Sequence, residues 1–209
     1  MIIEFFGFPA VGKTTFQERC IREQCFLCEG MVTPVILKEE ISKPERLKVV
    51  LFVVANPRLL YIVLKLCWSC RSGGIDTLRY TYRFLMKIYM MKSALSWQRN
   101  YLCDELGIQA VWSIFIKSRI VNHRLIEEIL NYLKPMYCKA KLIYIEDNSY
   151  DVVRYIGERK WGTSRFDSFS DSEKRYYITT GKHVMDWILY YMRELDYPLE
   201  VYEVNRFEK

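Results

Sequence analysis

The sequence has no long uninterrupted apolar run. Its most apolar segment, residues 47–68, contains Lys48, Arg58 and Lys65, and an Asn-Pro dipeptide at residues 56–57 breaks it near the middle. A transmembrane helix needs about 20 consecutive apolar residues. We therefore expect no membrane span, and we expect two apolar helices that are either buried or turned toward a partner. A homodimer that forms through these helices is one such arrangement.

Two further patterns that the sequence lacks are a secretory leader and a nucleic-acid-binding run. No positively charged leader precedes the first apolar residues, so we expect a cytoplasmic protein. The 31 basic and 25 acidic residues give a net charge of +6, but no basic run has interleaved aromatic residues. This excess suits a polyanionic ligand, and we do not expect nucleic acid as a partner. Repeats and low-complexity tracts are also absent, and residues 1–209 predict a single domain.

The seven cysteines include two pairs with Cys-x-x-Cys spacing, Cys25/Cys28 and Cys67/Cys70. Four thiolates at such spacings are typical of a zinc site. Both pairs fall in segments expected to be helical, where cysteine commonly serves as a small apolar residue. The pattern therefore favours packing over zinc, and a disulfide framework is not expected in a cytosolic chain.

A phosphate-binding pattern stands near the start of the chain. Residues 7–14 read Gly-Phe-Pro-Ala-Val-Gly-Lys-Thr, after the apolar strand candidate 2–6 and before a segment with helical spacing of apolar residues. The glycines let successive backbone N–H groups curl around an anion, and the following helix adds its positive end. Lys13 can reach the β- and γ-phosphates of a nucleotide, while the Thr14 hydroxyl can bind Mg²⁺. The residues expected to hold the nucleotide are Gly7, Pro9, Ala10, Val11, Gly12, Lys13, Thr14 and Thr15.

Acidic residues follow two other expected strands. The short apolar run before Asp104 predicts a strand whose terminal carboxylate completes the Mg²⁺ site, usually through a bound water. Glu105 is a candidate for orienting the acceptor or taking its proton, or for a structural hydrogen bond at a helix start. Glu40, after the strand candidate 33–37, is a second candidate base, with a solvated loop charge as the alternative.

The later part of the chain predicts further elements. A helix is expected from Asn122 until Pro135 stops it, then a buried strand over residues 141–145, and a capped helix from Ser170 to about residue 195 before a last strand. Gln109 and Trp112 are candidates for lining an acceptor pocket.

A basic, glycine-containing segment at residues 159–167 predicts a lid over the nucleotide, with bounds of about 154–170. Its guanidinium groups would offset charge on the transferred phosphoryl group, and the candidates are Arg154, Arg159 and Arg165. Arg154 has an alternative role as the helical ion-pair partner of Glu158.

The order of these features resembles the P-loop kinases of the thymidylate/adenylate kinase superfamily. The resemblance implies an α/β fold of three layers, with a five-stranded parallel sheet, helices on both faces and a lid. It also implies transfer of the γ-phosphoryl group of ATP, with Mg²⁺, to a small acceptor such as a nucleoside, a nucleotide or a similar metabolite. The Asp-Arg-aromatic sequence of thymidylate kinases and the Glu-Arg-Ser of deoxynucleoside kinases are absent here, which leaves the acceptor open.

An alternative from another class is a P-loop ATPase or nucleotide-dependent switch that acts on a protein partner. The apolar helices at residues 47–68 are the docking surface that this hypothesis would use. The sequence has no clear guanine-reading Asn-Lys-x-Asp, which favours ATP over GTP.

Overall fold

The structure, a computed structural model, describes residues 2–9, 11–23, 35–36, 43–70, 74–96, 101–103, 105–116, 121–146 and 169–203. Its strands are β1 (Ile2–Gly7), β2 (Val35–Ile36), β3 (Tyr101–Cys103), β4 (Ala140–Glu146) and β5 (Leu199–Glu203). They form one parallel sheet in the order β2-β3-β1-β4-β5. The predicted parallel α/β fold is confirmed, and β1 lies at the centre of the sheet. The expected lid spans residues 154–170. Of these, residues 154–168 lie outside the described part of the chain, and only residues 169 and 170 are described.

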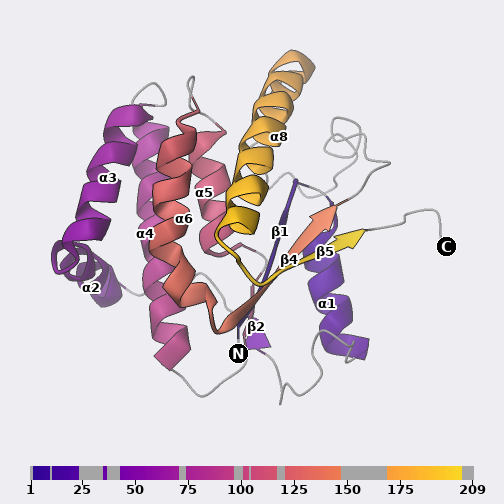
Figure 1. Cartoon of the computed structure of the whole chain (residues 1–209), viewed down its shortest axis with the longest axis horizontal. Coiled ribbons are helices and arrows are strands. Elements are labelled where there is room, and N and C mark those ends of the chain that lie inside the picture. The colour runs from indigo at the N-terminus through magenta and orange to yellow at the C-terminus, as the bar shows by residue number, and fades with distance from the viewer. Residues whose placement is uncertain are drawn as a thin grey trace.

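Helices cover both faces of this sheet (Figure 1). Helix α1 (Lys13–Glu23) lies on one face, while α5 (Gly107–Phe115) and α6 (His123–Tyr137) contact the sheet from the other. Helices α4 (Ile75–Ser96) and α8 (Asp171–Glu194) flank α5 and α6. Helices α2 (Lys43–Val54) and α3 (Pro57–Ser69) pack on α4 and α6 as an outer layer.

Strand β1 is buried on both faces, as expected for the central strand of a parallel sheet. Because side chains alternate along a strand, Ile3 and Phe5 pack with α1, whereas Ile2 and Phe6 join the larger core beneath α5 and α6. Glu4 has the same parity as Ile2 and Phe6 and is fully buried. The strand therefore sends a carboxylate into the helical layer.

Two helix starts predicted from the sequence are confirmed by their caps. Asn122 precedes α6, and its side-chain oxygen accepts a hydrogen bond from the Leu125 N–H at 3.1 Å. Ser170 precedes α8 and forms a reciprocal capping box with Glu173. Each cap satisfies N–H groups that a helix start leaves without a helical acceptor.

The prediction that Pro135 ends its helix is wrong, because α6 continues to Tyr137. Leu133 and Tyr137 are fully buried on either side of the proline, whereas the proline itself is exposed. Packing of these two side chains holds the last turn against the core. A proline so close to the end disrupts only the final hydrogen bonds of the helix.

Helices α2 and α3 are buried on one side only, so the first of the two expected arrangements, full burial, is wrong. The outward face of α2 consists of Leu47, Val50, Leu51 and Val54, all of which are exposed. Among the described helices, none alone has the length and apolar character to span a bilayer. The pair α2 and α3 passes the same test only jointly, with a bend of 102° between them.

The structure describes one of the two Cys-x-x-Cys pairs, Cys67 and Cys70 at the end of α3, and neither cysteine forms a disulfide bond. Burial raises the pKa of the Cys67 thiol. No group of three or more His, Cys, Asp or Glu side chains suited to a metal ion occurs within the described ranges. The other pair, Cys25 and Cys28, lies outside them.

Candidate nucleotide-binding site

The candidate phosphate-binding loop starts where β1 ends, at Gly7. This residue has φ +151°, and a Cβ added to it would lie 2.5 Å from the backbone oxygen of Ile145 on β4. Both the backbone conformation and the close approach of the neighbouring strand require glycine. The residue at which the chain leaves the sheet must therefore be a glycine.

We expect Gly7→Ala to destabilise the fold by roughly 3 kcal/mol, because the substitution adds a backbone clash to an unfavourable φ. Gly74→Ala is the matched control, since Gly74 also has a positive φ, +56°, but its Cβ would meet no atom within 4 Å. Its cost should be nearer 1 kcal/mol. Urea unfolding of both variants measures the difference, and equal midpoints would show that the contact with Ile145 is unimportant.

The other end of the loop is open and leads into α1. Gly12 has φ +95°, and a Cβ there would meet nothing within 4 Å. Val11 is buried against the α1 side of the sheet, and the N–H of Phe16 donates to the Gly12 oxygen at 2.8 Å in the first helical turn. A fixed loop with open space beside it, at the positive end of a helix, suits an anion.

Lys13 lies across this loop. Its ammonium group donates hydrogen bonds to the backbone oxygens of Gly7 at 3.0 Å and Phe8 at 2.8 Å. Thr14 and Thr15 follow in the first turn of α1 and are exposed. The structure thus brings the cation, the loop glycines and the two hydroxyl groups together, as the motif predicts.

A fully buried carboxylate holds the start of α5. One oxygen of Glu4, Oε1, accepts hydrogen bonds from the backbone N–H groups of Leu106 and Ile108, both at 3.1 Å, and of Gln109 at 3.2 Å. The other oxygen accepts from the Tyr137 hydroxyl. A helix start normally takes its cap from the preceding residues. Here the cap comes from β1, about 100 residues earlier in the chain.

Gln109 connects this helix start to the phosphate-binding loop. Its side-chain oxygen accepts a hydrogen bond from the Gly7 N–H at 3.0 Å, in the protein interior. Trp112, one turn further along α5, is also buried and donates from its ring N–H to the Gly181 oxygen at 2.8 Å. Both side chains form internal hydrogen bonds, and their role in lining an acceptor pocket stays a prediction.

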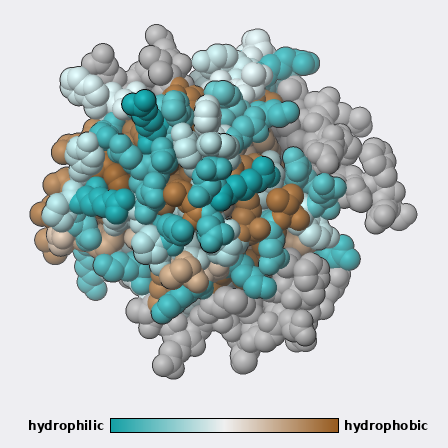
Figure 2. Space-filling model, in the orientation of Figure 1, coloured by the Kyte–Doolittle hydropathy of each residue, from teal (hydrophilic) through white to brown (hydrophobic). Residues whose placement is uncertain are grey.

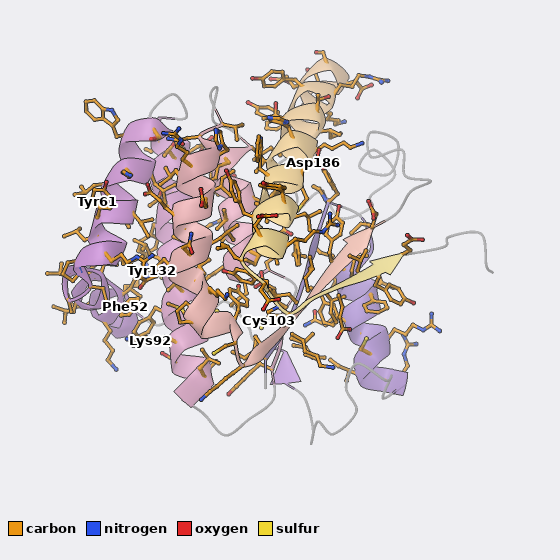
Figure 3. The ribbon with its side chains drawn as sticks, in the orientation of Figure 1. Phe52, Tyr61, Lys92, Cys103, Tyr132 and Asp186 are labelled. Carbon is orange, nitrogen blue, oxygen red and sulfur yellow. The ribbon has the colours of Figure 1, made fainter. Side chains whose placement is uncertain are left out.

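The turn between β3 and α5 is also held from the α4 side. The ammonium group of Lys87, itself almost buried, donates to the backbone oxygen of Glu105 and lies 3.5 Å from its carboxylate. The turn follows Cys103, the last residue of β3, which is paired with Glu4 in the sheet (Figure 3). Glu4 and Lys87 therefore hold the residues that directly follow the expected metal-binding acid in the sequence.

Several predicted site residues lie outside the described part of the chain. They are Ala10, Glu40, Asp104, Arg154, Arg159 and Arg165. Cys103 and Glu105, on either side of Asp104 in the sequence, are described. The roles of these residues stay predictions.

Burial dominates the titration of Glu4. It raises the pKa of this carboxyl group to about 7, although the hydrogen bond from Tyr137, the Gln109 N–H and the charge of Lys87 act in the opposite direction. The pKa of the Tyr137 hydroxyl is also raised, because it is buried next to Glu4. Glu4 consequently changes its protonation state near neutral pH.

The free energy of unfolding should therefore depend on pH through Glu4. The folded state keeps a proton that the unfolded state, with a pKa near 4.5, releases. Stability from this group is complete below pH 4.5 and is lost as the pH rises to about 7, by about 3 kcal/mol in total. Urea titrations of the wild type and of Glu4→Gln between pH 4.5 and 8 should show this loss only in the wild type. Parallel curves would contradict the assignment.

Two residues of this site were missed by the sequence reasoning. Glu4 received no role within the apolar strand candidate 2–6, and Gln109 was only a pocket candidate. An acid in the middle of an otherwise apolar central strand is itself a signal, because a buried charge requires partners. Those partners are 102 to 133 residues away in the sequence, so no local pattern identifies them.

Comparison with known proteins supports the fold. No protein-family model and no curated protein matches this sequence. Among solved structures, the chain is similar to a deoxyadenosine kinase from M. mycoides with bound dATP, at 15% identity and a TM-score of 0.54. That match covers 97% of this chain and 91% of the other. A second structure of the same kinase, with products dCMP and a flexible dCDP bound, has 19% identity and a TM-score of 0.45 over 97% and 89% of the two chains. The first likeness supports the predicted α/β fold with a parallel sheet.

Proposed function

We propose that this protein is an ATP-dependent phosphotransferase that transfers the γ-phosphoryl group of MgATP to a small hydroxylated acceptor, most naturally a nucleoside. The observation that carries the proposal is the position of Lys13, whose ammonium group lies across the loop that follows β1. The conformation of this loop requires a glycine at position 7. The similarity in fold to a deoxyadenosine kinase supports a nucleoside as the first acceptor class to test.

The loop fits the phosphates of a nucleotide. The space beside Gly12 is open, and α1 begins at the next residue, so its positive end faces the loop. Lys13 has three N–H donors, two of which contact backbone oxygens of the loop. Exchange of one such contact for a phosphate oxygen would place a full positive charge against the transferred group. Pro9, Ala10 and Val11 complete the loop around the phosphates.

We assign Mg²⁺ binding to the hydroxyl group of Thr14 and the carboxylate of Asp104. The metal would neutralise charge on the phosphate oxygens. Glu4 and Lys87 support this site indirectly, because they hold the turn that follows β3.

For the acceptor hydroxyl, Glu105 and Glu40 are the two candidate bases. The exposed carboxylate of Glu105 lies 3.5 Å from the ammonium group of Lys87, which orients it. Arg154, Arg159 and Arg165 are assigned to offset charge on the phosphoryl group as it moves. Phosphoryl transfer depends mainly on such positioning and charge stabilisation.

The test is transfer of labelled phosphate from ATP, with Mg²⁺, into deoxyadenosine, other nucleosides, nucleoside monophosphates and sugars. One labelled product, formed by the wild type and lost in Lys13→Ala, would establish a kinase and identify the acceptor. Lys141→Ala is the matched control, since this half-exposed lysine on β4 pairs only loosely with Glu200, at 3.9 Å. Release of free phosphate without any labelled acceptor would overturn the kinase proposal in favour of an ATPase that acts on a partner.

A further inference from the structure

Helix α2 has an exposed apolar face between Leu47 and Val54. Leu47, Val50, Leu51 and Val54 follow each other at the spacing of one helical face, and between 52% and 64% of each residue is exposed. This arrangement is the reverse of a helix on the surface of a globular protein, which turns polar residues to water. The face has no partner among the described residues.

Helix α3 continues the same surface. Tyr61 and Leu64 are exposed, and Trp68 is 74% exposed at the end of the helix. Figure 2 shows apolar residues gathered at the edge of the molecule where Figure 1 places α2 and α3. We refer to the exposed apolar residues of these two helices as the outer apolar face. It combines aliphatic side chains with two aromatic ones that have polar tips, as do sites at a membrane interface.

Positive charge is concentrated in the same part of the chain. Residues 43–96, which include α2, α3 and α4, contain ten basic and two acidic residues, whereas the rest of the chain contains 21 basic and 23 acidic residues. The net positive charge of the protein thus belongs to the segment that forms the outer layer and its support, while the rest of the chain has a small net negative charge. Such an asymmetry within one chain indicates a negatively charged partner.

Several of these cations lie at the rim of the outer apolar face. The guanidinium group of Arg58 is 5.9 Å from the ring centre of Tyr132, and the ammonium group of Lys92 is 4.8 Å from that of Phe52 (Figure 3). Each cation therefore stands beside an aromatic ring with an apolar surface next to it. Apolar side chains surrounded by positive charges match the acyl and headgroup regions of an anionic lipid surface.

We propose that the outer apolar face docks this protein onto an anionic membrane surface. The 12 residues of α2 and the 13 of α3 are each too short to span a bilayer, and the bend of 102° separates them. They would lie in the interface, with Leu64 and Trp68 inserted among the lipids and the basic rim at the headgroups. This docking is independent of the phosphotransferase activity.

A second copy of this chain fits the same face less well. In a two-fold symmetric contact each patch meets its own equivalent, so the two basic rims would repel each other. Nucleic acid also fits less well, because its binding sites are polar and charged and this face is apolar at its centre.

The test is sedimentation of the full-length protein with vesicles of phosphatidylcholine alone and of phosphatidylcholine with phosphatidylserine, at low and high salt. We expect binding only to the vesicles with phosphatidylserine, weakened by salt. The variant Leu64→Ser/Trp68→Ser should bind about tenfold more weakly, because it removes two inserted apolar side chains. The matched control is Tyr176→Ser/Val201→Ser, which replaces two comparably exposed apolar residues on α8 and β5. Thermal unfolding verifies that both variants are folded.

Equal sedimentation with both kinds of vesicle, or none with either, would overturn the proposal. So would equal loss of binding in the two double variants. Light scattering of the protein without vesicles tests the alternative of a dimer. A stable dimer that is dissociated by Leu64→Ser/Trp68→Ser, but not by the control variant, would also overturn the membrane proposal. That result would assign the outer apolar face to a second copy of the chain.

Discussion

Lys13→Ala should lower the rate of phosphoryl transfer roughly a thousandfold, which corresponds to about 4 kcal/mol of transition-state stabilisation. The ammonium group stands at the proposed phosphate-binding loop, and alanine leaves no positive charge at this position to act on the transferred group. Its bonds to Gly7 and Phe8 contribute little to folding, about 1 kcal/mol, because water replaces them when the side chain is removed. Steady-state transfer assays and thermal unfolding measure the two effects separately.

A substitution that preserves charge sharpens this test. Lys13→Arg keeps the positive charge, but its planar guanidinium group cannot reproduce a compact ammonium bound to two adjacent backbone oxygens. We expect a loss of at least about tenfold in this variant as well. Full activity in Lys13→Arg would show that only charge is needed, and full activity in Lys13→Ala would remove this lysine from the mechanism.

Glu4→Ala should destabilise the protein by about 4 kcal/mol or more, the largest effect on stability that the structure predicts. The substitution leaves three backbone N–H groups at the start of α5 and the Tyr137 hydroxyl without their acceptor, all in the protein interior. It also leaves a cavity beneath the helix. Urea unfolding at pH 5, where the glutamic acid of the folded wild type is protonated, measures the loss without the cost of a buried charge.

The glutamine variant separates the hydrogen bonds from the charge. In Glu4→Gln the side-chain oxygen can still accept from the three N–H groups, and the amide can donate to Tyr137, so stability at pH 5 should stay within about 1 kcal/mol of the wild type. Glu200→Ala, on the exposed strand β5, should cost less than about 0.5 kcal/mol. If Glu4→Ala is no less stable than Glu200→Ala, the carboxylate is not the anchor of α5. If Glu4→Ala does not fold, a folded Glu4→Gln with the expected stability still supports the assignment.

The sequence alone predicted the parts of the fold in which local residues carry the information. Three such features depend on residues within a few positions of each other. They are the strand and turn before Lys13, the caps at Asn122 and Ser170, and the break between α2 and α3. The phosphate-binding loop belongs to this class, because its glycines, lysine and threonine form one contiguous segment. Its conformation at Gly7 and the place of Lys13 across it agree with the motif.

Features that depend on distant packing could not be predicted in this way. Pro135 does not end α6, because buried residues on both sides of it hold the last turn. The partners of Glu4 come from α5 and α6, and their identity required the arrangement of the whole sheet. The sequence left open whether α2 is buried or turned toward a partner, because apolar composition does not distinguish a face that meets the core from one that meets a partner.

The position of Glu4 also has a consequence for synthesis of the chain. Strand β1 is made about 100 residues before its neighbour β3 and the helix that Glu4 caps, so at 5–20 residues per second it waits roughly 5–20 s for them. During that time Ile2, Ile3, Phe5 and Phe6 form an unpaired apolar segment of the kind that aggregates. With its ordinary pKa the Glu4 side chain is ionised in the nascent chain, and a charge within such a segment opposes association with other chains. The same carboxyl group that later anchors the helix first protects the strand on which it stands.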